Sequence, residues 1–319
     1  MAHEVETLTY YGQVPWHGLG NPLPEEGLRD WKIACETAGL SWKVVQETLL
    51  IAANGHAVES HVANVRASDN KILGVVGSDY EVLQNCEAFE WFGPILESGD
   101  ATIEAAGALR GGSRIFALAK ISGAEGQVRE FSVNASTPDN VNRYILLSHS
   151  HDGSLAVRVG ITDIRVICHN TLTAAHDSES SKLIRLRHTK NVKKNLETVR
   201  EILDVTRQGF FATLEQYRLL ASAEFNQSDI LRYVELVFNV DPNLTLHKRT
   251  KDRINQIVDL AYHGKGNNGA TLWDAYNAVT EFTSWHRGTS NETRLNSVWF
   301  GDSAKLNKKA FDTALELVA

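Results

Sequence analysis

The fold is constrained most strongly by residues 143–175, which read RYILLSHSHDGSLAVRVGITDIRVICHNTLTAA. The first seven residues are rich in β-formers, and the following His-Asp-Gly-Ser is typical of a turn because Gly153 can adopt a positive φ. Apolar residues then alternate with small or charged ones, which is the pattern of a half-buried strand: Leu155, Val157, Val159 and Ile161. The stretch therefore predicts a β-hairpin.

The alternation slips by one residue after Asp163, because Ile164 and Val166 become the apolar positions. Such a slip predicts a β-bulge or a break in the strand. Asn170 or Thr171 is a suitable N-cap for a short helix over the following residues. The whole stretch thus predicts a hairpin, a bulged strand and a helix.

Strand-like and helix-like segments are separated along the chain. Strand patterns precede or flank the central stretch, at 44–52, 58–67, 72–76, 102–109 and 114–121. Helical patterns occur at 28–38, at 85–96, in a long segment from Lys190 with a heptad-like seam, and at 230–238, 248–263, 271–282 and 303–318. Hairpins followed by helices predict an α+β protein: an antiparallel β-sheet domain with flanking helices, then a mostly helical C-terminal region.

Three parts are predicted along the chain. Residues 1–42 form an N-terminal arm and helix, residues 43–180 the antiparallel sheet domain, and residues 181–319 the helical region. Residues 1–180 carry 12 Lys/Arg against 23 Asp/Glu, whereas residues 181–319 carry 20 against 16. Net charges of −11 and +4 suggest that the second half faces an anionic partner; the alternative is ordinary compositional drift.

Composition excludes several classes of protein. No run of about 18 apolar residues is present, and no basic segment with an apolar run opens the chain, so neither a membrane span nor a signal peptide is predicted. The three cysteines are scattered and form no CxxC motif, which disfavours a disulfide framework or a zinc site. We expect a cytoplasmic protein without a cofactor.

A basic segment joins the sheet domain to the long helix, with six Lys/Arg in 13 residues. Such a density can neutralise several phosphates and indicates nucleic-acid binding; the alternative is a solvated start of a helix. The residues predicted to contact phosphates in this segment are Lys182, Arg185, Arg187, Lys190, Lys193 and Lys194. Arg143, Arg158 and Arg165 lie on predicted strands and extend this hypothesis to the sheet, unless they are edge-strand charges that oppose aggregation.

Two other segments contain residues suited to binding a metal ion or an anion. His149, His151 and Asp152 allow a metal site, because histidines two apart on a strand point to the same side; the alternative is a polar hairpin turn. The Gly-rich loop 263–271 precedes a helix but does not match a phosphate loop, so a flexible connection is the better interpretation. No catalytic residues are predicted.

Four blocks carry a resemblance to a known family. They are PWHGLG at 15–20, GSDYEVLQNCEAF at 77–89, HDGS…VGITDIRVICHNTL at 151–172 and LRH at 186–188. ATLWDAYNAVTEF and VWFGDSAKLNKKAF also fit. Together they resemble the phage/plasmid-like proteins grouped as domain of unknown function 932, which implies a mobile element and provides no catalytic residues.

The order of elements also resembles phage single-strand annealing proteins of the RecT and Red-beta type, which lay single-stranded DNA along a basic groove. We therefore expect a non-enzymatic, oligomeric protein of a phage or plasmid that binds or anneals single-stranded DNA, as in recombination. The alternative is a protein-interaction factor, such as an inhibitor of host defence, with a host protein partner. A metal-dependent enzyme is the third hypothesis.

Overall fold

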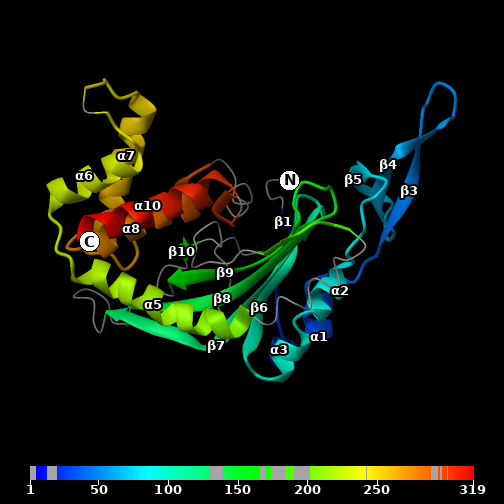
Figure 1. Ribbon diagram of the computed structural model, residues 1–319, viewed down its shortest axis with the longest axis horizontal. Helices are drawn as coiled ribbons and strands as arrows, with labels where there is room; N and C mark the ends of the chain where they lie inside the picture. The colour runs from blue at the N-terminus through cyan, green and yellow to red at the C-terminus, as the bar shows by residue number, and fades with distance from the viewer. Residues whose placement is uncertain are drawn as a thin grey trace. The chain divides into compact units, whose positions relative to one another are not determined.

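The structure of the protein, a computed structural model, describes residues 5–12, 20–129, 139–165, 170–173, 184–189, 202–241, 243–288, 294, 297–299 and 301–319. Its antiparallel sheets and C-terminal helices confirm the predicted α+β class (Figure 1). None of the helices in this part of the chain has both the length and the apolar character of a membrane span.

The larger sheet has eight strands in the order β10-β9-β8-β7-β6-β1-β2, and β11 also pairs with β9. The β1–β6, β6–β7, β9–β10 and β9–β11 pairs are antiparallel, whereas β1 and β2 are parallel. The strands are β1 Val5–Tyr10, β2 Asn21–Pro22, β6 Ala101–Leu109, β7 Arg114–Arg129, β8 Asp139–Ser150, β9 Val157–Arg165, β10 Asn170–Thr173 and β11 Ile184–Leu186.

A separate three-stranded sheet has the order β3-β4-β5, with β3 at Val44–Leu50, β4 at Ala57–Arg66 and β5 at Lys71–Gly77. Its three strands confirm the strand patterns at 44–52, 58–67 and 72–76. Asn70 adopts a φ of 57° in the turn between β4 and β5, a conformation that asparagine tolerates better than most residues.

Contacts divide the chain into two units, and neither is a continuous stretch. The first, here the N-terminal unit, contains residues 1–122, 144–160 and 183–203; the second, the C-terminal unit, contains residues 123–143, 161–182 and 204–319. The chain passes between the units within β7, β8 and β9. The predicted boundaries at 42 and 180 differ because they follow changes in composition, which do not report where long strands cross.

Short helices cover part of the sheet in the N-terminal unit: the 3₁₀ helix Glu25–Leu28, α1 Trp31–Thr37, α2 Asn85–Glu90 and α3 Gly93–Glu97. Helices α1 and α3 contact β6. The Asp30 carboxylate accepts hydrogen bonds from the backbone N–H groups of Lys32 and Ile33, which fixes the start of α1. Pro94 falls in the first turn of α3, so the predicted helix 85–96 restarts there.

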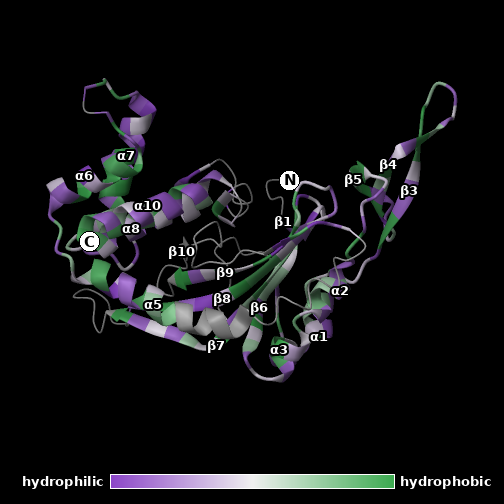
Figure 2. Cartoon of the chain, viewed as in Figure 1, coloured by the Kyte–Doolittle hydropathy of each residue, from purple (hydrophilic) through white to green (hydrophobic). Residues whose placement is uncertain are grey.

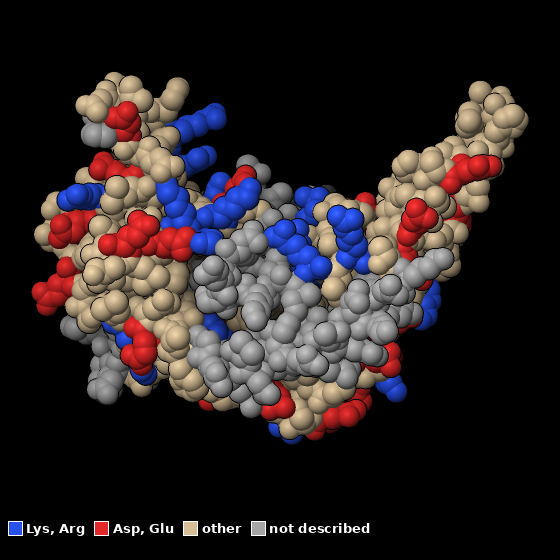
Figure 3. All heavy atoms as spheres, in the orientation of Figure 1, with Lys and Arg blue, Asp and Glu red and all other residues tan. Residues whose placement is uncertain are grey.

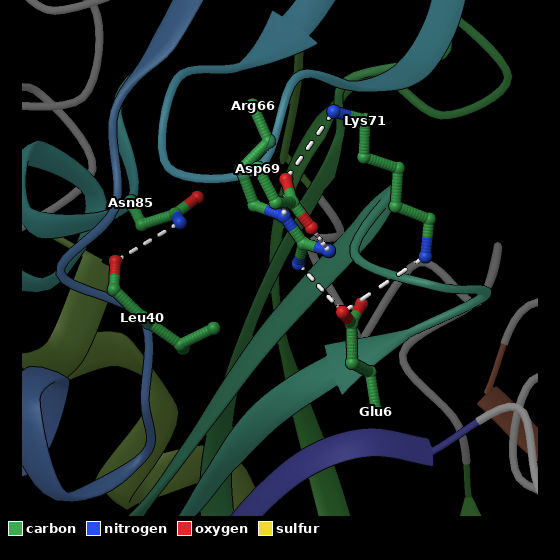
Figure 4. A network of polar contacts seen from close by, with 6 residues as sticks. All are labelled: Glu6, Leu40, Arg66, Asp69, Lys71 and Asn85. Atoms are coloured by element: carbon green, nitrogen blue, oxygen red, sulfur yellow. Dashed lines mark hydrogen bonds and ion pairs between the residues drawn. The ribbon is translucent and has the colours of Figure 1, made fainter.

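A polar network ties the β4–β5 turn to β1 (Figure 4). The Arg66 guanidinium lies 2.6 Å from a Glu6 carboxylate oxygen and 2.8 Å from an Asp69 oxygen. Lys71 approaches Glu6 at 3.9 Å, and the Arg66 side chain also covers the Trp42 ring at 5.2 Å. Two carboxylates therefore compensate this largely buried arginine, as a buried charge requires.

The C-terminal unit consists mainly of helices: α5 Ile202–Ser222, α6 Gln227–Val237, α7 Lys248–His263, α8 Leu272–Glu281 with a π-helical turn at Phe282–His286, and α10 Asp302–Val318. Helices α6, α7 and α10 are amphipathic and alternate between hydrophilic and hydrophobic residues (Figure 2). Their apolar faces enclose an aromatic core of Tyr217, Trp273, Tyr276 and Phe311.

Local signals located these helices well. A capping box of Thr271 and Asp274 is present at the start of α8. Asn226 caps helix α6, and Gly301 occupies the N-cap position of α10. Helix α5 is described from residue 202, so the predicted start at Lys190 lies outside the described residues.

The prediction of a helix after Asn170 is wrong. Residues 170–173 form β10, which pairs antiparallel with β9. The β-branched Thr171 and Thr173 suit a strand, and pairing with β9 outweighs the capping preference of Asn170. The register shifts between Thr171 and Thr173, opposite Ile164 and Asp163, so the irregularity predicted for β9 involves its pairing partner.

Candidate nucleic-acid interface

The basic segment is described only in part. Lys182, Lys190, Lys193 and Lys194 lie outside the described residues, and Arg165 is the last residue of β9. Arg185 and Arg187 lie within and directly after β11, and both are exposed. Two of the predicted phosphate contacts are thus accessible at the surface of the N-terminal unit.

The register brings another predicted residue beside them. In the antiparallel β9–β11 pair, Arg158 lies opposite Arg185, and Arg158 is half-buried. Like charges directly opposite in a sheet repel, so this arrangement favours an anionic neighbour. The structure therefore brings Arg158 beside Arg185 and Arg187, which lie 27 and 29 positions further along the sequence.

Arg143 belongs to a different environment. It lies in β8 within the C-terminal unit, where its Nε and Nη2 donate to the Asp163 carboxylate at 2.7 and 2.9 Å. The side chain is 8 % exposed and that of Asp163 is fully buried. The guanidinium also lies 4.8 Å from the centre of the Phe210 ring and donates to Thr213. Arg143 therefore stabilises the interior and does not present its charge on an open sheet face, contrary to our hypothesis.

The histidine turn is also part of the interior, within the N-terminal unit. His149 and His151 are fully buried, with ring centres 4.9 Å apart, and His188 lies 6.1 Å from His149. His151 Nε2 is 2.8 Å from Asn85 Oδ1, and the Asn64 amide donates to the His151 carbonyl. The two histidine rings lie together, as expected for positions i and i+2 of a strand, and the hydrogen bonds of His151 reach helix α2 and strand β4.

Burial keeps these three histidines neutral. Desolvation lowers the pKa of His151 to about 3 and that of His188 to about 4, and it lowers the pKa of His149 well below its ordinary value. Among the described residues, neither ring nitrogen of His149 has a hydrogen-bond partner. Within the described ranges, no group of three or more His, Cys, Asp or Glu side chains is arranged to hold a metal ion.

The C-terminal unit contains a basic pocket with a volume of about 390 Å³. Four cationic side chains line it, and the lining contains one carboxylate, Asp302. The cations come from α7, from the residue after the π-helical turn, and from α10: Arg253, Arg287, Lys305 and Lys309. Figure 3 shows Lys and Arg side chains gathered over α7 and α10. The pocket thus has a net positive charge suited to an anion.

The π-helical turn positions Arg287. A π-turn inserts an extra residue into a helix and is often found at functional sites. Here it spans Phe282–His286 at the end of α8, and the backbone N–H of Arg287 donates to the Phe282 carbonyl at 2.8 Å. Burial lowers the pKa of Arg287, Asp302 opposes this effect and Arg253 adds to it. Arg287 and Arg253 are therefore close enough to repel each other.

The other three cations of the pocket differ in how many contacts they make with the protein. Lys309 Nζ donates to the carbonyls of Leu236 and Val237 at 3.1 and 2.6 Å, which satisfies the C-terminal end of α6. Lys305 is exposed and reaches Asp302 at 3.5 Å. Arg253 is exposed and has no carboxylate partner among the described residues. Lys309 is thus tied to the protein, whereas Arg253 and Lys305 are available to a ligand.

The sequence does not mark this pocket. Its four cations span 56 positions and belong to three segments, so they form no local run. Arg287 also lies beyond the predicted helix 271–282, where a sequence pattern gives no sign of a π-turn. The one indication was the excess of positive charge in residues 181–319.

Comparison with known proteins gives the family. By its fold and its candidate site, the chain is an α+β protein with a large antiparallel sheet and a basic pocket. The family described as Domain of unknown function (DUF932) matches residues 72–300, so the chain belongs to this family, as the motifs suggested. No curated protein and no solved structure matches the chain.

Proposed function

We propose that this protein binds single-stranded nucleic acid through its phosphates, as a non-enzymatic cytoplasmic protein of a phage or plasmid. The observation that carries the proposal is the basic pocket, in which Arg253, Arg287, Lys305 and Lys309 surround a single carboxylate. Four cations around one anion leave an excess of positive charge that phosphate groups can neutralise.

The pocket suits a flexible, phosphorylated chain. A volume of about 390 Å³ accommodates part of a nucleotide but not a duplex. Guanidinium groups such as Arg253 and Arg287 match phosphate oxygens in a two-point geometry. Phe238, which is half-buried, also lines the pocket, and an aromatic ring that meets a base contributes about 1–3 kcal/mol. Backbone charge and stacking together favour a single strand.

The exposed arginines around β11 extend the proposal. Arg185 and Arg187 belong to the basic segment whose charge density predicts phosphate contacts. An annealing role of the RecT and Red-beta type, and assembly into a homo-oligomer, would place several such surfaces along one strand. Repeated binding along a strand makes such assembly cooperative.

Fluorescence anisotropy with a labelled oligothymidine tests the proposal. We expect binding at low salt that weakens linearly on a log–log plot, with a slope of about −0.7 for each phosphate contact. With four contacts, the affinity would fall about 50-fold between 50 and 200 mM salt, as that slope requires. Absence of binding at the lowest salt concentration would contradict the proposal.

A protein-interaction role is the second candidate, and exposed apolar residues of the three-stranded sheet favour it. Val45, Ile72 and Val75 are 42, 64 and 52 % exposed. Apolar side chains gathered on one small sheet suit a protein partner, such as a host factor. A purified partner that binds with unchanged affinity after nuclease treatment would favour this role over nucleic-acid binding.

A further inference from the structure

Two cysteines meet between the short helices of the N-terminal unit. Cys35 lies in α1 and Cys86 in the first turn of α2, 51 positions apart in the sequence. Their Sγ atoms are 2.8 Å apart and both thiols are free. A disulfide has a length of about 2.0 Å, so a small movement of one side chain would bring the sulfurs to bonding distance.

We propose that Cys35 and Cys86 form a reversible redox pair, in which a peroxide oxidises Cys86 first and Cys35 completes the bond. The proposal depends on the contact between the two sulfurs and on their different exposure. It is independent of the proposed nucleic-acid binding, because the pair and the basic pocket belong to different units.

Exposure and charge assign the first step to Cys86. Cys86 is half-buried, whereas Cys35 is 1 % exposed, so a dissolved oxidant reaches Cys86. The hydrogen bond from the Cys35 thiol lowers the pKa of Cys86 to about 7, with a further contribution from Lys43. The same contact, together with burial, raises the pKa of Cys35. Only Cys86 therefore has a large thiolate fraction near neutral pH.

The chemistry balances with hydrogen peroxide as the oxidant. The Cys86 thiolate attacks one peroxide oxygen, the O–O bond breaks, and hydroxide leaves with the electron pair, which gives a sulfenic acid. The Cys35 sulfur then attacks Cys86 Sγ, the S–O bond breaks, and the thiol proton leaves with the hydroxyl group as water. In sum, two thiols and one peroxide give one disulfide and two molecules of water.

The bond would close a loop around a complete substructure. The residues between the two cysteines contain the whole β3-β4-β5 sheet, and residue 85, adjacent to Cys86, holds His151 through its side-chain amide. Closing a loop of this length restricts the unfolded chain. We therefore expect oxidation to raise the Tm by about 5–10 °C.

Peroxide titration of the purified full chain tests the pair. We expect intact mass spectrometry to show the loss of two hydrogen atoms, and peptide mapping to show a Cys35–Cys86 crosslink that dithiothreitol reverses. Cys168→Ser serves as the matched control and should give the same crosslink. If Cys35 and Cys86 both remain free thiols after oxidation, or if the crosslink contains Cys168, the proposal is wrong.

Single substitutions test the order of the two steps. In Cys35→Ala, the sulfenic acid of Cys86 should accumulate and react with dimedone, because no resolving thiol is present. In Cys86→Ala, Cys35 should remain unmodified at the same peroxide dose. Dimedone labelling of Cys35 in the second variant would overturn the order. A circular dichroism spectrum matching that of the wild type would show that each variant is folded.

Discussion

Arg143 and the four cations of the basic pocket, all in the C-terminal unit, differ in what neutralises their charge. Arg143 is 8 % exposed and makes two hydrogen bonds to a fully buried carboxylate, Asp163. In the basic pocket, Asp302 is the one carboxylate in a lining with four cations. The charge of Arg143 is neutralised within the protein, whereas the charge of the pocket cations is neutralised only in part.

The difference explains why residue type alone is a poor guide to function. An arginine on a predicted strand suggests a binding site. A buried arginine, however, loses its hydration and needs a carboxylate partner, and Asp163 provides that partner for Arg143. Arg253 and Lys305 look ordinary on amphipathic helices, and their exposure leaves them open to a ligand. Substitution of Arg143 should therefore lower stability, and substitution of the exposed pocket cations should weaken binding.

Removing the buried arginine should produce the largest effect. Arg143→Met leaves the Asp163 carboxylate buried without its partner, which costs about 3–5 kcal/mol of unfolding free energy. Urea denaturation followed by circular dichroism measures this loss. The double variant Arg143→Met, Asp163→Leu should recover part of it, because no buried charge remains. A loss below about 1 kcal/mol in the single variant would contradict the structural role.

Acid should destabilise the N-terminal unit through its buried histidines. Their folded pKa values, about 3 for His151 and about 4 for His188, lie below the ordinary value of 6.5, so the unfolded chain binds more protons. The contribution of these histidines to the unfolding free energy is therefore fully present above pH 6.5. It is lost as the pH falls toward 4, by about 1.4 kcal/mol per pH unit for each histidine. Urea midpoints between pH 7 and 4.5 measure the slope. His151→Asn should make it shallower, and an unchanged slope would exclude His151 as the cause.

Lys309 should show an intermediate effect, because it belongs to the pocket and also to the fold. Lys309→Met removes the hydrogen bonds to the last carbonyls of α6 and should cost about 1–2 kcal/mol. Thermal unfolding measures this change. Oligonucleotide affinity should fall in the same variant, so a loss of stability without any loss of affinity would remove Lys309 from the binding surface.

The exposed pocket cations should show the smallest effect on stability. Arg253→Ala and Lys305→Ala remove side chains from solvent-exposed positions, and each should change the unfolding free energy by less than about 0.5 kcal/mol. Urea denaturation checks this expectation. A larger loss in either variant would mean that the residue stabilises the fold, and the contrast with Arg143 would then disappear.

The sequence predicted most of the local structure, because local signals decide it. Helix α7 begins and ends where its apolar pattern does, and Thr271 with Asp274 marks the start of α8. Residues 170–173 were predicted wrongly because pairing with β9, a distant interaction, outweighs a capping preference. The division into units was also out of reach, since it depends on where long strands cross.

The candidate site was harder to predict than the fold. Exposure and partners decide which cations can bind a ligand, and a single sequence gives neither. Nothing near Arg143 in the sequence shows that Asp163 will face it from the next strand. Conversely, the position of Arg287 results from a π-turn at 282–286, which has no sequence signature.

The salt dependence of oligothymidine binding tests the central claim that the basic pocket receives phosphates. The double variant Arg253→Ala, Lys305→Ala is compared with wild type and with Lys32→Ala, Arg232→Ala, which loses the same charge from exposed positions outside the pocket lining. We predict that the pocket variant binds at least about tenfold more weakly at low salt, with a log–log slope shallower by about 1.4. The control should keep the wild-type slope. Equal slopes for the pocket variant and the control would contradict the account.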